Sequence, residues 1–159
     1  MKPYHDNAIG CVVALLNRDI LREFRTADSC VRQATCLSGE YHPAVRRQIA
    51  ALAAAAMRNA TALAAEVLAL GGMPIVPRHR EPRALASKAI RQSPGTEHKM
   101  LAHYQRRVRM AERLGLFRLR EVFLTILISK EQHLSHLGLL QAQSPSGRLY
   151  LLEYAWRSR

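Results

Sequence analysis

The stretch Thr125–Leu140, TILISKEQHLSHLGLL, decides the fold. It has the composition of an apolar helix, but a Lys-Glu-Gln-His cluster stands in its middle. Alternating steps of three and four residues trace one face of a helix. Only two polar residues fall on the line traced here, Lys130 and His133, so we predict that both point into a protein core. The line consists of Leu116, Leu119, Phe123, Ile126, Lys130, His133, Leu137 and Leu140.

Three further segments show the same periodicity, and no segment alternates with the period of a strand. Turn signals separate them at Ser38–Pro43, where the proline suits a helix start, and at Gly71–Gly72 and Gly115, which suit helix ends. The expected helices cover about residues 6–38, 44–70, a stretch ending near 114, and 116–143. Asp6 or Asn7 would cap the first helix.

Each of the other three helices also carries one polar residue on its inward line. These residues are Glu23, Asn59 and Glu97. Glu23 and Asn59 are thirty-six residues apart, and so are Glu97 and His133. The equal spacing predicts two helical hairpins of one register. The other inward lines are Ile9, Val13, Leu16, Ile20, Glu23, Ala27, Cys30, Ala34; Ile49, Leu52, Ala56, Asn59, Leu63, Leu70; and Glu97, Leu101, Tyr104, Val108, Ala111.

The predicted fold is therefore all-α, a four-helix bundle of two antiparallel hairpins joined by a long crossover. The bundle would occupy residues 1–143. The crossover is rich in Pro and Arg over 75–81, and weak helical sequence follows from Pro82 until Ser93-Pro94-Gly95 interrupts it. Residues 144–159 are expected to form a tail or a short fifth helix.

Three quoted segments carry a resemblance to a known family. AMRNATALAAEVLALGGMP (56–74) is similar to a second helix with a Leu-Gly-Gly-Leu-Pro-like ending. TEHKMLAHY (96–104) is similar to a third helix with its glutamate, and ILISKEQHLSHL (126–137) to a segment with a Glu-x-x-His motif. On these motifs the chain resembles the ferritin-like superfamily, and bacterioferritin most closely, from about Leu16 to Leu140. The resemblance implies a ferritin-like bundle.

The family binds two irons with a glutamate on each of two helices and Glu-x-x-His on the other two. The resemblance places Glu23, Glu97 and His133 at ligand positions. The other three ligand positions hold Ala56, Asn59 and Lys130. We therefore expect a degenerate site without ferroxidase activity.

In a metal-free core Lys130 would replace the metal's charge beside Glu23 and Glu97, which are otherwise costly to bury. Asn59 and His133 would satisfy the remaining carboxylate lone pairs. The alternative is a reduced, mononuclear iron or manganese site formed by Glu23, Glu97 and His133.

Met57 stands where bacterioferritin supplies a haem ligand at a two-fold dimer interface. A methionine in an alanine-rich helix is more often a packing residue, and no other haem signature is present. We expect no resident cofactor, with iron or manganese as the alternative and haem the least favoured.

The formal net charge is +12, with twenty arginines against four lysines. Such a surface suits partners that carry phosphates or carboxylates, so non-specific binding of nucleic acid or another polyanion is a further hypothesis. The ordinary alternative is a solvated basic surface, since the arginines are spread along the chain. Three groups of basic residues stand out: Arg18, Arg22, Arg25 and Arg32 on the first expected helix; Arg106, Arg107, Arg109 and Arg113 on the third; and Arg78, His79, Arg80 and Arg83 in the crossover.

Cys11, Cys30 and Cys36 form no Cys-x-x-Cys pair, and we interpret them as small core residues in a reducing compartment. No apolar stretch approaches the eighteen or more residues of a membrane span, and the N-terminal AIGCVVALL lacks a cleavage pattern. We expect a cytoplasmic homo-oligomer, a dimer or larger, with no membrane partner and a structural or binding role.

Overall fold

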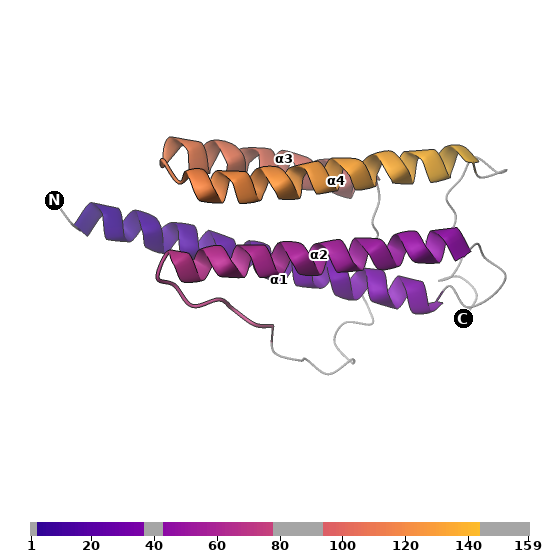
Figure 1. The fold of residues 1–159 in the computed structure, drawn as a ribbon, viewed down its shortest axis with the longest axis horizontal. Helices are drawn as coiled ribbons and strands as arrows, with labels where there is room; N and C mark the ends of the chain where they lie inside the picture. Colours follow the sequence, from indigo (N-terminus) through magenta and orange to yellow (C-terminus); the bar gives the residue numbers. More distant parts are fainter. Residues whose placement is uncertain (1–2, 37–42, 78–93, 144–159) are drawn as a thin grey trace. The chain divides into compact units, whose positions relative to one another are not determined.

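The computed structural model describes residues 3–36, 43–77 and 94–143. Within these ranges all regular structure is helical, in four α-helices and no strand, as predicted (Figure 1). None of the helices there is long and apolar enough to cross a membrane. The weak helical sequence from Pro82 and the tail 144–159, with its short helix, lie outside the described residues. The four helices are α1 (Pro3–Cys36), α2 (Pro43–Ala69), α3 (Pro94–Arg113) and α4 (Phe117–Gln143).

Three of these helices begin at a proline: Pro3, Pro43 and Pro94. Proline fits the first helical position because its φ is already helical and its missing N–H would have no partner there. The start predicted at Pro43 is confirmed. The start predicted at Asp6 or Asn7 is wrong, because α1 already begins at Pro3.

The helices α2 and α3 end in the same hydrogen-bonded turn. At the end of α2, Gly72 N donates to Val67 O at 2.9 Å and Gly71 N to Leu68 O at 2.9 Å. Gly71 has φ of 75°, a left-handed conformation that costs glycine least. This is the Schellman pattern, which satisfies the last carbonyl groups of a helix. The glycine stop predicted for the second helix is confirmed.

The end of α3 repeats the pattern around Gly115, whose φ is 66°. Leu116 N donates to Ala111 O at 2.9 Å and Gly115 N to Glu112 O at 3.1 Å. Arg120 N then donates to Leu116 O at 2.9 Å, so α4 starts directly. The short turn predicted at Gly115 is confirmed.

The described helices divide into two compact units. The first holds α1 as far as Val31 and α2 from Ala51 onward. The second holds α3 and α4 together with the remaining turns of α1 and α2.

In the first unit, α1 and α2 lie antiparallel (Figure 1). Glu23 contacts Asn59, and nearer the start of α1 Val13 lies against Gly72. A Cβ atom on Gly72 would lie 2.6 Å from Val13 Cγ1 and 3.1 Å from Val67 Cγ1. Only glycine therefore lets the chain leave α2 this close to α1.

The segment after α2 is tied to α1 by one buried side chain, that of Asn17. Its Nδ2 donates to the carbonyl oxygen of Met73 at 3.1 Å, and its Oδ1 accepts from the backbone N–H of Ile75 at 2.8 Å. The amide thus satisfies a donor and an acceptor of a non-helical segment. The crossover therefore starts in a fixed position against α1.

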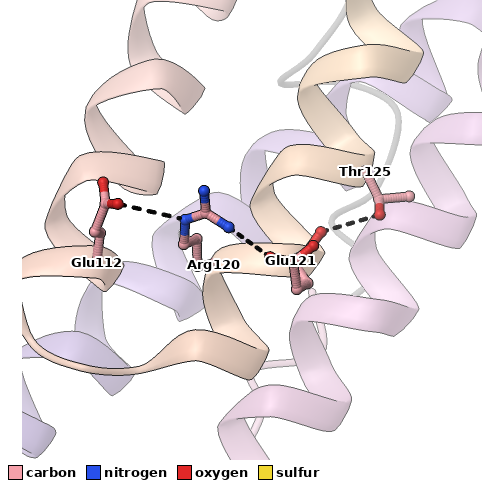
Figure 2. A network of polar contacts seen from close by, with 4 residues as sticks. All are labelled: Glu112, Arg120, Glu121 and Thr125. Carbon is pink, nitrogen blue, oxygen red and sulfur yellow. Dashed lines mark hydrogen bonds and ion pairs between the residues drawn. The ribbon is translucent and has the colours of Figure 1, made fainter.

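In the second unit, α3 and α4 lie antiparallel and pack through aromatic residues. The ring centroids of Tyr104 and Phe123 are 6.2 Å apart, and both side chains are fully buried. Nearer the turn, Arg120 lies between two glutamates (Figure 2). Its Nη1 is 2.6 Å from Glu121 Oε1, and its Nε is 3.8 Å from Glu112 Oε1. Both carboxylates are more than half exposed, so these ion pairs stabilise the turn by at most about 1 kcal/mol.

The inward lines predicted from the sequence agree with the observed burial. Every residue on them whose side chain the structure describes is buried or half-buried. Lys130 is buried with 6% of its surface exposed, and His133 is half-buried. The side chains of Glu97, Leu137 and Leu140 lie outside the described ones. The three-four periodicity therefore identifies the buried face of each helix.

Candidate functional site

A buried carboxylate and a buried amide meet between α1 and α2. Glu23 is 0% exposed and Asn59 is 7% exposed. Asn59 Nδ2 donates to Glu23 Oε2 at 3.2 Å. A buried carboxylate is costly without hydrogen bonds, and a hydrogen bond to a charged group contributes about 1.5–3 kcal/mol. The amide therefore offsets part of the cost of burying Glu23.

The antiparallel hairpin explains why two residues so far apart in sequence meet. Both lie on the inward lines of their helices, Glu23 thirteen residues before the end of α1 and Asn59 sixteen residues after the start of α2. Ala56 lies one turn before Asn59 on the same face of α2 and is 1% exposed. Its methyl group offers no polar atom beside the pair.

The second unit holds a buried cation on α4. Lys130 is 6% exposed and keeps a polar interaction with its surroundings. Its place on the helix follows Phe123 and Ile126, which are fully buried, so its alkyl stem continues an apolar face. His133 stands one turn further on and is half-buried. The predicted partner Glu97 belongs to α3, but its side chain lies outside the described ones.

The two α2 residues at predicted ligand positions supply no carboxylate or imidazole to a metal. Ala56 has no ligand atom, and Asn59 directs its amide N–H, which cannot ligate a metal, at Glu23. Among the side chains that the structure describes, no three of His, Cys, Asp and Glu are grouped as a metal site would require. The side chain of Glu97 is not among those described. The predicted set of Glu23, Glu97 and His133 thus stays a prediction.

Met57 is 41% exposed on α2, on the side of the helix away from Asn59 and Leu63. It is therefore not a core packing residue. Of the cysteines, Cys30 is buried as predicted, whereas the prediction of a core position is wrong for Cys11, which is exposed. Cys11 lies off the inward line of α1, between Ile9 and Val13. The side chain of Cys36 lies outside the described ones.

Three buried polar residues were not predicted: Asn17, Asp19 and Glu66. Asp19 is 0% exposed, and its Oδ1 is 3.4 Å from Arg22 Nη1, one turn along α1. Asp19 is four residues before Glu23, and Glu66 is seven residues after Asn59. Helical spacing from Glu23 and Asn59 is thus the signal that could have found Asp19 and Glu66, whereas Asn17 stands at no such spacing.

Charge is separated between the interior and the surface. Within the described side chains, the buried charged residues are three acids, Asp19, Glu23 and Glu66, and one base, Lys130. The exposed ones are four acids and eleven bases. The described surface is therefore more strongly basic than composition alone indicates. Its exposed charged residues are Asp28, Glu112, Glu121 and Glu131, and Arg18, Arg25, Arg32, Arg46, Arg47, Arg58, Lys99, Arg106, Arg109, Arg113 and Arg118.

Arg22 and Arg107, named in the sequence with these bases, are half-buried. The predicted cluster at Arg78, His79, Arg80 and Arg83 lies outside the described residues. Comparison of the chain with protein-family models and with curated proteins finds no match.

Proposed function

We propose that the two hairpins form a ferritin-like four-helix bundle in which a metal-free polar core replaces the metal site. The observation that carries this proposal is the 3.2 Å hydrogen bond from Asn59 to Glu23. Both residues stand where the sequence resemblance expects metal ligands. A carboxylate oxygen that accepts an amide N–H is satisfied without a cation. The protein would then have a structural or binding role and no ferroxidase activity.

Lys130 supports the same proposal through its charge. The resemblance expects a bridging glutamate at this position, where a carboxylate would offset the charge of two cations. A buried lysine instead brings a positive charge of its own. In the proposed bundle it serves as the counter-charge that a metal ion would otherwise supply to the carboxylates.

Restoring the missing ligands tests this proposal. The triple variant Ala56→Glu, Asn59→His and Lys130→Glu returns all three ligand types that the resemblance expects. We expect wild type to purify without iron or manganese and to oxidise ferrous ion no faster than buffer. The triple variant should be destabilised without metal and stabilised by added manganese or ferrous ion, by about 2.7 kcal/mol at a hundred times its Kd. Elemental analysis measures the metal content, and thermal unfolding measures the stability with and without metal.

The single variant Ala56→Glu is the matched control. It buries one more carboxylate without completing a ligand set, so it should lose stability and regain little with metal. Iron oxidation by wild type above the buffer rate, abolished in Glu97→Ala, would contradict the proposed loss of activity. A triple variant that is stabilised by neither manganese nor ferrous ion would count against the ferritin-like assignment itself.

We also propose that the chain assembles into a homo-oligomer through the outer face of α2. From Ala51 to Leu68 the exposed side chains of this helix carry only one charge, that of Arg58. Met57 and Leu68 are 41% and 60% exposed there. An extended face with so few charges is typical of surfaces that contact another protein. The exposed residues are Ala51, Ala54, Met57, Arg58, Thr61, Ala65 and Leu68.

Placing a charge on this face should separate the subunits. We expect Ala54→Arg to shift the mass measured by sedimentation equilibrium from a dimer or larger oligomer toward the monomer, because a buried unpaired charge opposes association. Ala14→Arg makes the same change at an exposed position on α1 and should leave the mass unchanged. A wild type that is monomeric at all concentrations would refute the assembly.

A further inference from the structure

One side of α3 is a row of cations. Lys99, Arg106, Arg109 and Arg113 are all exposed. At 100° per residue they fall within an arc of about 80°, and the row is about 21 Å long at 1.5 Å per residue. Tyr104 and Ala111, both 0% exposed, lie on the opposite side of the helix. We name these four residues the α3 cationic face.

Among the described residues, no acid pairs with this face. In the part of the chain that the structure describes, none of its four side chains forms an ion pair. Among the α3 side chains that the structure describes, one acid is exposed, Glu112, and it lies 3.8 Å from Arg120 of α4. Arg109 has like charges three residues before it and four residues after it, an arrangement that destabilises a helix. The isolated protein therefore keeps an unfavourable charge arrangement that an anionic partner would relieve.

The chemistry of the face selects the kind of partner. Every exposed residue of α3 with a described side chain is polar, namely His98, Lys99, Gln105, Arg106, Arg109, Glu112 and Arg113. A helix that inserts into a membrane surface needs apolar residues beside its bases. Protein interfaces are usually anchored by buried aromatic or apolar groups. Single-stranded nucleic acid is bound through aromatic stacking. The described part of the α3 surface supplies none of these.

A duplex backbone needs only the charges. It presents one negative charge per about 1.7 Å of its axis, whatever the base sequence. The seven-residue steps from Lys99 to Arg106 and from Arg106 to Arg113 span about 10.5 Å each. That distance is close to the width of the major groove, about 12 Å. Successive members of the row can therefore reach phosphates on both sides of a groove.

We propose that the α3 cationic face binds the phosphate backbone of double-stranded nucleic acid without regard to base sequence. This proposal does not depend on the ferritin-like assignment. The test is fluorescence anisotropy of a labelled 20-base-pair duplex titrated with the full-length protein between 50 and 200 mM salt. Four phosphate contacts predict a slope of log K against log salt of about −3.6, so affinity should fall about 150-fold over this range.

Removing two of the four charges should halve the slope. For Arg106→Gln with Arg109→Gln we expect a slope of about −1.8 and only about a 12-fold fall in affinity over the same range. The matched control is Arg25→Gln, which removes one exposed charge from α1 and should leave the slope unchanged. The single variant Arg109→Gln should lower the slope by about 0.9.

Charge reversal separates binding from folding. Arg109→Glu places a carboxylate between Arg106 and Arg113 at helical spacing, so its Tm should equal or exceed that of wild type. Its affinity for the duplex should nevertheless fall below that of Arg109→Gln. Duplexes of unrelated sequence should bind alike.

Four results would overturn the proposal. They are no binding by wild type at 50 mM salt, an unchanged slope in the double variant, an equal loss in Arg25→Gln, and equally tight binding to phosphatidylserine vesicles that depends on the same arginines.

Discussion

Asn59→Asp is expected to lower the free energy of unfolding by about 3–5 kcal/mol at neutral pH. The substitution keeps the size of the side chain but replaces the donor that faces Glu23 Oε2 at 3.2 Å with a second carboxylate. Two buried carboxylates at this distance cannot both stay ionised at low cost. Chemical denaturation monitored by circular dichroism measures the loss.

The pH dependence of this variant follows from the proton that the pair must take up. In the unfolded chain both carboxyl groups are solvated and lose their protons at ordinary acidic pH. In the folded variant one proton is retained to higher pH, so the folded state binds more protons in that window. Stability relative to wild type therefore rises as the pH falls through it.

A matched control removes the amide without adding charge. Asn59→Leu deletes the donor, so it should cost about 1.5–3 kcal/mol with no comparable recovery at low pH. If Asn59→Asp were as stable as wild type at neutral pH, Glu23 would not depend on the amide.

Lys130→Met is expected to cost about 3–5 kcal/mol, although methionine is apolar and similar in length. Lys130 is 6% exposed and has a polar interaction. In the proposed polar core, removing its ammonium would leave the buried carboxylates without their counter-charge. The matched control is Lys99→Met, the same substitution at an exposed lysine on α3. It should change the free energy of unfolding by less than about 0.5 kcal/mol. Thermal and urea unfolding of both variants make the comparison.

The proposed polar core requires that Lys130 balances the charge of Glu23. Comparing Lys130→Met in wild type with Lys130→Met in the Glu23→Gln variant tests this requirement. In Glu23→Gln the carboxylate is already neutral, so the further loss on Lys130→Met should be smaller by about 0.5–3 kcal/mol. Equal losses of stability in the two backgrounds would show that Lys130 and Glu23 do not interact. A fully stable Lys130→Met would mean that the ammonium reaches solvent.

Periodicity predicts which helix faces are buried but not how wide they are. A three-four line is one residue wide, whereas a packed helix buries an arc of 100° or more. Asn17 and Asp19 lie on the flanks of such an arc, so the line through Leu16, Ile20 and Glu23 passes between them. The burial of Asn17 depends on what the rest of the fold places beside α1, and a single helix does not contain that information.

Local chemistry predicts some turns better than others. Gly71 and Gly115 stop their helices through backbone geometry that glycine alone adopts easily, and both stops are where the sequence places them. The start of α1 is different, because Pro3 and Asp6 are both acceptable first residues. The tie between Asn17 and Ile75, fifty-eight residues apart, has no local signal at all.

That tie has a consequence for hydrogen exchange. The N–H of Ile75 belongs to no helix, yet it donates to Asn17, a buried side chain of α1. An amide in such a position exchanges with solvent only when its hydrogen bond to the side chain breaks. Asn17, the acceptor, lies on the packed face of the first unit. The exchange rate of the Ile75 amide would therefore report the opening of the α1–α2 hairpin rather than the fraying of a loop. A coil residue thereby becomes a probe of how α1 and α2 separate.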